Sequence, residues 1–142
     1  MTRQTRGDEA GARAAYERAI THDARSGVAA NNLAWLYAEL GRSDEALVLA
    51  QRATAALHNA PQALDTLGWV HHLAGRSDEA IRAFQEALAK RPDNPAYHYH
   101  LGAAYLRAGR MDDARASLQQ ALHLSSSFDG VETARKMLSD MH

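Results

Sequence analysis

The sequence predicts an all-α fold, an α-solenoid of antiparallel helix pairs with a 34-residue period and about eight helices. Two observations support this prediction. The hexapeptide GRSDEA occurs twice, at 41–46 and at 75–80, so its copies begin 34 residues apart. Alanine is abundant, β-branched residues are sparse, and only 3 prolines interrupt the 142 residues, which favours helices. A fixed period of this length is typical of proteins that stack one supersecondary unit many times.

The 34-residue period continues outside the hexapeptide and fixes the positions of small residues. A glycine lets the chain turn sharply between two helices, and an alanine lets two helices approach closely. We therefore expect the periodic glycines in turns and the periodic alanines at helix contacts. The glycines are Gly7, Gly41, Gly75 and Gly109, and the alanines are Ala12, Ala46, Ala80 and Ala114, then Ala19, Ala53, Ala87 and Ala121.

Between these markers, each unit divides into two helices. Ser43 and Ser77 are the expected N-caps of second helices, because a serine hydroxyl accepts a hydrogen bond from a free N–H group of the first turn. Pro61 and Pro95 are expected in the first turn of first helices, where proline is tolerated. The expected first helices span 28–40, 61–74 and 95–108, the second helices span 43–57, 77–90 and 112–124, and single helices at 8–20 and 129–141 flank them.

The whole chain, 1–142, is expected to form a single domain that begins with a second helix alone. A repeat cannot bury its apolar face without a neighbour. Three interpretations of the start therefore remain: a fragment of a longer repeat protein, a natural cap, or an edge that pairs with another subunit. The expected divisions are a half repeat at 7–26, repeats at 27–60, 61–94 and 95–128, and a C-terminal capping helix at 129–142.

The markers of the middle unit resemble those of the tetratricopeptide repeat family, whose 34-residue unit is a helix-turn-helix. The resemblance covers about residues 7–141 and implies a right-handed solenoid whose first helices line a concave inner surface. The last repeat and the final helix are also loosely similar to bacterial repeat proteins of the cell envelope and polysaccharide export. The family pattern is present in Leu67, Gly68, Gly75, Ala80, Phe84 and Ala87, with Pro92 closing the unit.

Composition and motifs exclude several classes of function. The formal net charge of −1 gives no basis for nucleic-acid binding, and no apolar run is long enough for membrane insertion. The chain has no cysteine, and therefore no disulfide or thiol chemistry. It contains no phosphate-binding glycine loop, nucleophile elbow or HExxH motif, so we expect no enzyme activity, no catalytic residue and no cofactor. No signal peptide is recognised, so the expectation is a cytoplasmic protein by default, or part of a longer exported one.

The histidines were candidate metal ligands because four of the 8 are clustered, at His71, His72, His98 and His100. Two ligands on one helix need a spacing of three or four residues, since adjacent or alternate residues point in different directions. We therefore expect no metal site, with His71 in place of a packing tyrosine and His98 in the core. The alternative is a meeting of histidines across neighbouring repeats.

The resemblance and the helical period together predict which residues face the concave surface. Both tryptophans, Trp35 and Trp69, fall at one equivalent position of consecutive units. An exposed aromatic stripe there would mark a binding site, whereas the alternative is that both tryptophans pack into the core. The predicted peptide-binding groove consists of Asn31, Asn32, Trp35, Glu39, Asp65, Trp69, His72, Tyr99, His100 and Arg107.

These residues, together with the lack of catalytic motifs, predict a non-catalytic protein–protein interaction module that binds a peptide or partner segment in its concave groove. One subclass of the family clamps a chaperone's C-terminal carboxylate with asparagine and lysine side chains. Trp35 and Trp69 stand at its asparagine position, which argues against that role. Two other functions remain open. One is a self-assembling structural unit, a homo-oligomer joined through the N-terminal half repeat, and the other is a regulatory or targeting segment of a longer protein.

Overall fold

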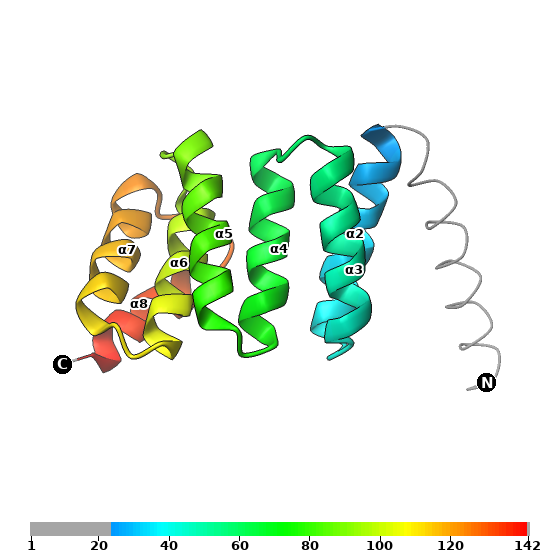
Figure 1. Cartoon of the computed structure of the whole chain (residues 1–142). Helices are drawn as coiled ribbons and strands as arrows, with labels where there is room; N and C mark the ends of the chain where they lie inside the picture. The colour runs from blue at the N-terminus through cyan, green and yellow to red at the C-terminus, as the bar shows by residue number, and fades with distance from the viewer. Residues whose placement is uncertain (1–23, 142) are drawn as a thin grey trace, which may run out of the picture.

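The computed structural model describes residues 24–141, and all the regular secondary structure in this range is α-helical (Figure 1). The predicted all-α fold of paired helices is confirmed, with helix bounds within a few residues of those expected. The predicted helix at 8–20 lies outside the described residues. The described helices are α2 (Ala24–Glu39), α3 (Ser43–Ala56), α4 (Pro61–Leu73), α5 (Ser77–Lys90), α6 (Pro95–Arg107), α7 (Met111–Leu124) and α8 (Val131–Asp140).

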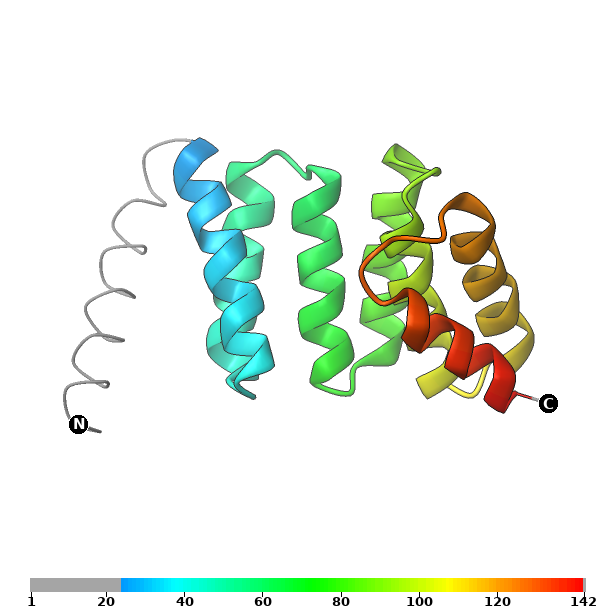
Figure 2. The ribbon, with the colours of Figure 1, turned by 180° about the vertical axis from the view of Figure 1, so that it is seen from behind.

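The helices pack in two layers that are not equally tight (Figures 1 and 2). Each first helix packs most extensively on the second helix of its own unit, as α2 does on α3, α4 on α5 and α6 on α7. The first helices also contact one another, whereas no comparable contact joins α3 to α5 or α5 to α7 within residues 24–141. Because the first helices lie closer together, the stack curves toward the layer of α2, α4 and α6. We call the exposed side of this layer the inner face.

The turn that follows each first helix is the same in all three described units. Gly41, Gly75 and Gly109 have φ angles of 79°, 82° and 80°, in the left-handed region that glycine adopts without strain. In each unit the next residue donates its N–H to a carbonyl five residues earlier, as Arg42 does to Tyr37 at 2.8 Å. This is the Schellman arrangement, which ends a helix by satisfying its last carbonyl groups. The expected role of the periodic glycines is confirmed in these three turns.

At the helix starts, the predicted positions of the prolines are correct, but the predicted caps are not. Pro61 and Pro95 are the first residues of α4 and α6, as predicted. The prediction that Ser43 and Ser77 are N-caps is wrong, because the cap positions belong to Arg42 and Arg76 and neither makes a side-chain cap hydrogen bond. The Arg42 carbonyl already accepts the N–H of Ala46, so the helical hydrogen bonds begin one residue before the serine.

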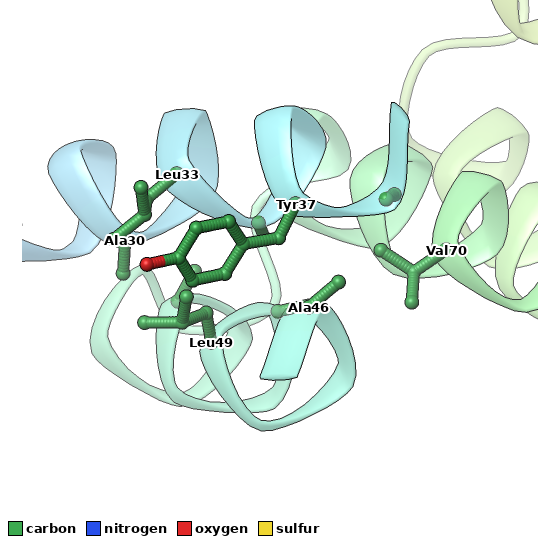
Figure 3. Close-up of a cluster of buried hydrophobic side chains, with 10 residues drawn as sticks. Ala30, Leu33, Tyr37, Ala46, Leu49 and Val70 are labelled. Carbon is green, nitrogen blue, oxygen red and sulfur yellow. The ribbon is translucent and has the colours of Figure 1, made fainter. Parts of the chain in front are cut away.

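The core is built from small residues that let larger side chains interlock. The periodic alanines of α3, α5 and α7 are fully buried. Val70 of α4 reaches back into the cluster formed by α2 and α3, so the core is continuous between units (Figure 3). A Cβ atom built on Gly68 would lie 2.6 Å from Phe84 Cε1, and one built on Gly102 would lie 2.7 Å from Leu118 Cδ2. The large side chains of α5 and α7 therefore fit directly over glycines of α4 and α6.

This fit predicts that Gly68→Ala lowers the free energy of unfolding by about 1–3 kcal/mol, because the added methyl group overpacks a closed site. Alanine is the better helix former by about 1 kcal/mol, so a gain in stability would contradict the steric argument. Urea denaturation is the measurement. The control is Gly68→Ala combined with Phe84→Leu, which makes room for the methyl group and should cost less than the sum of the two single changes.

Candidate functional site

The inner face holds most of the predicted groove residues, at different depths. Asn32, Glu39 and Arg107 are exposed, and Asn31, Trp35, Trp69 and Tyr99 are partly buried. Asp65, His72 and His100 lie beneath the surface, with 7%, 7% and 8% of their area exposed. The helical period correctly places all ten residues on first helices, but it does not give the depth to which neighbouring helices cover them.

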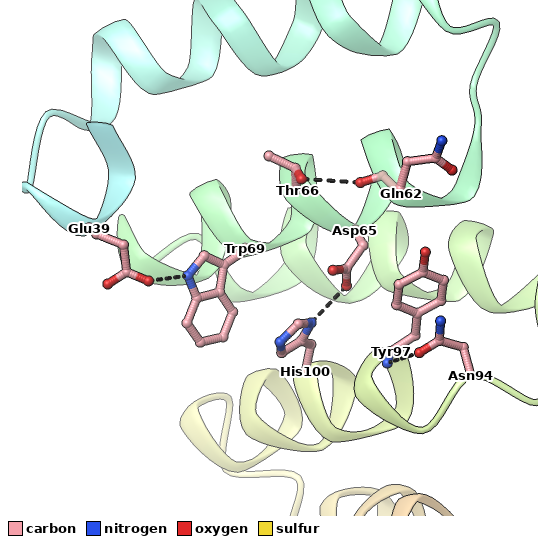
Figure 4. A network of polar contacts seen from close by, with 8 residues as sticks. All are labelled: Glu39, Gln62, Asp65, Thr66, Trp69, Asn94, Tyr97 and His100. Carbon is pink, nitrogen blue, oxygen red and sulfur yellow. Dashed lines mark hydrogen bonds and ion pairs between the residues drawn. The ribbon is translucent and has the colours of Figure 1, made fainter. Parts of the chain in front are cut away.

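The two tryptophans form a stack between α2 and α4. Their ring centroids are 5.3 Å apart and their planes differ by 8°. Trp69 also packs against the core, and its Nε1–H donates to Glu39 Oε1 at 3.2 Å (Figure 4). Each ring is partly buried, so the tryptophans form neither a fully exposed stripe nor a closed part of the core. Their equal position in consecutive units is what brings the two rings together.

A buried hydrogen bond between His100 and Asp65 lies beside this stack and joins α4 to α6. His100 Nδ1 is 2.8 Å from Asp65 Oδ1, and since a carboxylate can only accept, the histidine donates (Figure 4). The His100 ring also contacts Trp69 at 4.8 Å and Tyr99 at 5.4 Å, measured between centroids. His100 therefore anchors the aromatic cluster in a fixed orientation.

Asp65→Ala should lower the free energy of unfolding by about 1–3 kcal/mol, because the buried His100 Nδ1–H would lose its acceptor. Asp65→Asn is the matched control, since its amide oxygen can still accept that hydrogen bond, and its loss should be clearly smaller. Chemical denaturation at pH 7 compares the two. Equal losses for alanine and asparagine would show that the hydrogen bond contributes little to stability.

His72 is the second buried histidine of the inner face. Its ring lies 5.1 Å from that of Trp69, and its Nδ1 has no hydrogen-bond partner among the described residues. Burial, with smaller contributions from the charges of Arg107 and His100, lowers the pKa of His72 from 6.5 to about 4. Arg107 donates to the main-chain carbonyl of His72, which gives α4 and α6 a second connection. The ring is thus held in its neutral form near pH 7.

Tyr99 is partly covered by the segment that leads into α8. Its ring contacts Phe128 at 6.0 Å between centroids, and a Cβ atom built on Gly130 would lie 2.5 Å from Tyr99 Cε2. Burial raises the pKa of Tyr99, although a hydrogen bond with Thr133 acts in the opposite direction. The C-terminal segment therefore bounds the inner face at α6, and Tyr99 contributes only one side of its ring to that face.

His71 and His98 are the other two clustered histidines. Within residues 24–141 no group of three or more His, Cys, Asp or Glu side chains is placed to hold a metal ion. The prediction that His98 lies in the core is wrong: its Nε2 lies 2.8 Å from the Pro92 carbonyl oxygen, and Tyr97 occupies the buried position. His71 is partly buried at the position held by Tyr37 and Tyr105 in the other units, and burial lowers its pKa.

Among the described residues, no helix combines enough length with enough apolar character to span a bilayer.

Sequence reasoning missed two parts of this cluster. It did not pair Asp65 with His100, although their separation is one residue more than the period, which places them on facing sides of consecutive first helices. It also did not include Phe128, which follows α7 in a segment with no counterpart in the other units. A search for polar residues separated by one period plus or minus one residue would have found the first of these.

Comparison with known protein families relates this chain to repeat proteins. Two family models, both described as tetratricopeptide repeat, match residues 67–127 and 5–69. No curated protein sequence matches the chain.

Several solved structures share the fold. The structure of MamA superposes with a TM-score of 0.72 at 23% identity, covering 99% of this chain and 85% of MamA. The Yersinia enterocolitica type III secretion chaperone SycD, in complex with a peptide of the translocator YopD, gives a TM-score of 0.67 at 20% identity, covering 79% of this chain and 86% of SycD. PcrH, in complex with the chaperone binding region of PopD, gives a TM-score of 0.69 at 18% identity, covering 79% of this chain and 87% of PcrH. At these identities the likeness establishes a shared fold.

Proposed function

The chain belongs to the tetratricopeptide repeat family, and from this premise we propose that it is a non-catalytic interaction module that binds a peptide or partner segment on its inner face. The stack of Trp35 on Trp69 is the observation that carries the proposal. These are the only 2 tryptophans of the chain, and both lie partly exposed on the same face. Partly exposed aromatic rings are the side chains that most often dominate binding energy.

The geometry of the stack suits a binding surface. Each indole is held by its neighbour, and Trp69 is also fixed by its hydrogen bond to Glu39 and its contact with His100. A surface whose side chains are already ordered loses little conformational entropy when a partner binds. Exposed groups beside the stack, the Asn32 amide and the Glu39 carboxylate, can fix the orientation of a partner by hydrogen bonds. The complexes of SycD and PcrH with partner segments are consistent with this use of the fold.

The proposal predicts that a Trp35→Ala, Trp69→Ala double variant binds at least about tenfold more weakly to peptides selected on the wild-type chain. Peptides would be selected from a displayed random library on the immobilised chain, and their affinities measured by fluorescence polarisation. The matched control is Val48→Ala with Met111→Ala, which also removes two exposed apolar side chains, but from α3 and α7. Circular dichroism checks that both variants stay helical.

Two results would contradict the proposal. If the selected peptides bind the double variant and the wild-type chain equally well, the inner face is not the site. If the library yields no peptide whose binding depends on the tryptophans, peptide recognition by this face is wrong.

Self-assembly is a second candidate function, favoured by apolar side chains on α2. Val28, Leu36 and Leu40 are 48%, 52% and 58% exposed. Leu36 on α2 is equivalent to Val70 on α4 and Ala104 on α6, each one period later. Val70 and Ala104 are fully buried and contact the preceding unit. The side of α2 that would receive a neighbouring unit is thus apolar and exposed, which favours docking of a second copy. Sedimentation velocity over a range of concentrations tests this, and a constant monomer mass would exclude it.

A further inference from the structure

Among residues 24–141, Trp35 is the first aromatic ring of the inner-face array. Trp69 is contacted by Trp35 on α2, by His72 on its own helix and by His100 on α6. Trp35 stacks in parallel on Trp69 and makes one tilted contact with His100, at 5.8 Å between centroids. No other aromatic ring and no cation contacts Trp35 within residues 24–141. Trp35 is itself partly exposed, so part of its indole surface is open to a partner in the described structure.

Glu39 lies one helical turn after Trp35 on the same helix, so the two side chains share one side of α2. The carboxylate is exposed, and one of its oxygens accepts the Trp69 Nε1–H. A carboxylate can accept about four hydrogen bonds, so most of its capacity is unused. No cation of the described part of the chain pairs with Glu39. Several other exposed carboxylates, in contrast, have an arginine partner three residues away, namely Asp112, Asp113 and Glu132.

The other charged groups of the inner face are already engaged. Asp65 is buried against His100, and Arg107 donates to the carbonyl of His72. Glu39 is thus the carboxylate that the described inner face offers to a partner. An indole face attracts a cation through its quadrupole, and a carboxylate attracts it through its charge. A guanidinium group suits both, because it is planar enough to stack on the ring and carries a fork of donors for the carboxylate.

We infer that the inner face selects partners with a basic side chain, arginine in preference to lysine, which lies over Trp35 and pairs with the carboxylate of Glu39. The inference rests on the proposed peptide binding and adds the chemical class of the bound residue. It also assigns an orientation, because the basic residue of the partner lies at the α2 end of the inner face.

The test uses the same displayed library on the full chain, with sequencing of the selected peptides. We expect arginine, and less often lysine, to be enriched at one position of the peptides. Glu39→Gln keeps the acceptor for Trp69 but removes the charge, and it should weaken binding of an arginine peptide by about threefold to fivefold. Replacing that arginine by citrulline, its neutral isostere, should weaken binding to the wild-type chain by more than this factor, because the cation–π contact with Trp35 is lost as well. The same replacement should weaken binding to Glu39→Gln less than binding to the wild-type chain.

Matched changes separate this site from general charge. Glu86→Gln makes the same change of charge at an exposed position of α5 and should leave the affinity unchanged. Glu39→Lys should select acidic residues at the position where the wild-type chain selects arginine. If peptides bind through the tryptophans without any basic enrichment, or if Glu39→Gln and Glu86→Gln behave alike, the inference is overturned while the proposed function stands. If no peptide requires the tryptophans, both are overturned.

Discussion

Phe84→Ala should lower the free energy of unfolding by about 3–5 kcal/mol, the largest loss expected from a single substitution in the described part of the chain. The Phe84 ring is fully buried in the cluster that joins α5 to α6, and it lies directly over Gly68 of α4. It also contacts the His100 ring at 5.7 Å between centroids. Truncation would therefore leave a cavity between two units and remove a wall of the aromatic cluster.

The graded control is Phe84→Leu, since leucine occupies the equivalent position in the next unit as Leu118. This change keeps most of the buried volume and should cost less than about 1.5 kcal/mol. Urea denaturation monitored by circular dichroism gives both values. Similar losses for alanine and leucine would mean that the site does not depend on filled volume, contrary to the packing described above.

The second large effect is a loss of stability on acidification through His72. The pKa of this histidine is lowered from 6.5 to about 4 in the folded chain, so the folded state favours the neutral ring. Its contribution to stability is fully present above pH 6.5. It is lost as the pH falls toward 4, because the unfolded chain takes up a proton that the folded chain does not. The full shift corresponds to about 3 kcal/mol.

Denaturation of wild type and His72→Gln between pH 7.5 and 4 isolates this contribution. The wild-type free energy of unfolding should fall by about 3 kcal/mol more than that of the variant, because glutamine does not titrate. The groups that act on His72 from the other packed helix, Arg107 and His100, remain in both proteins. Parallel curves for wild type and His72→Gln would contradict the prediction.

The sequence predicted those parts of the fold that depend on local rules. Gly41, Gly75 and Gly109 could be placed in turns because only glycine adopts a left-handed conformation freely, and that requirement recurs with the period. Pro61 and Pro95 marked helix starts for an equally local reason. The serine caps failed because a helix boundary that differs by one residue moves the serine from the cap into the first turn.

Side-chain complementarity between helices was harder to predict. The position of Phe84 in its unit is held by Ala50 and Leu118 in the two other described units, and residue by residue these three look unrelated. In the structure, Phe84 and Leu118 each lie over a glycine of the preceding helix, while Ala50 is buried in the same cluster as Ala34. What recurs is a small residue on the first helix, Ala34, Gly68 or Gly102, 16 residues before each of these positions, and a search for identical residues does not detect it.

The depth of the candidate site escaped prediction for a related reason. Asp65, His72 and His100 lie on first helices, as predicted, but the burial of a side chain depends on how closely the neighbouring helix approaches. Three of the rings around His100, those of Trp35, Trp69 and Phe84, belong to other units. A period locates a residue on a helix, and only the packing of several helices determines its exposure.

The unequal tightness of the two layers has a mechanical consequence. When a curved stack bends, one layer keeps nearly constant spacing between its elements, and this is the layer with the stiffer contacts. Here that layer is the one in which α2 touches α4 and α4 touches α6, while α3, α5 and α7 have more room to spread or close. Flexing of the repeat stack would therefore change the spacing of the outer helices first and leave the Trp35–Trp69 distance nearly constant. Under the proposed function, the Trp35–Trp69 surface would keep its geometry while the curvature of the stack changes.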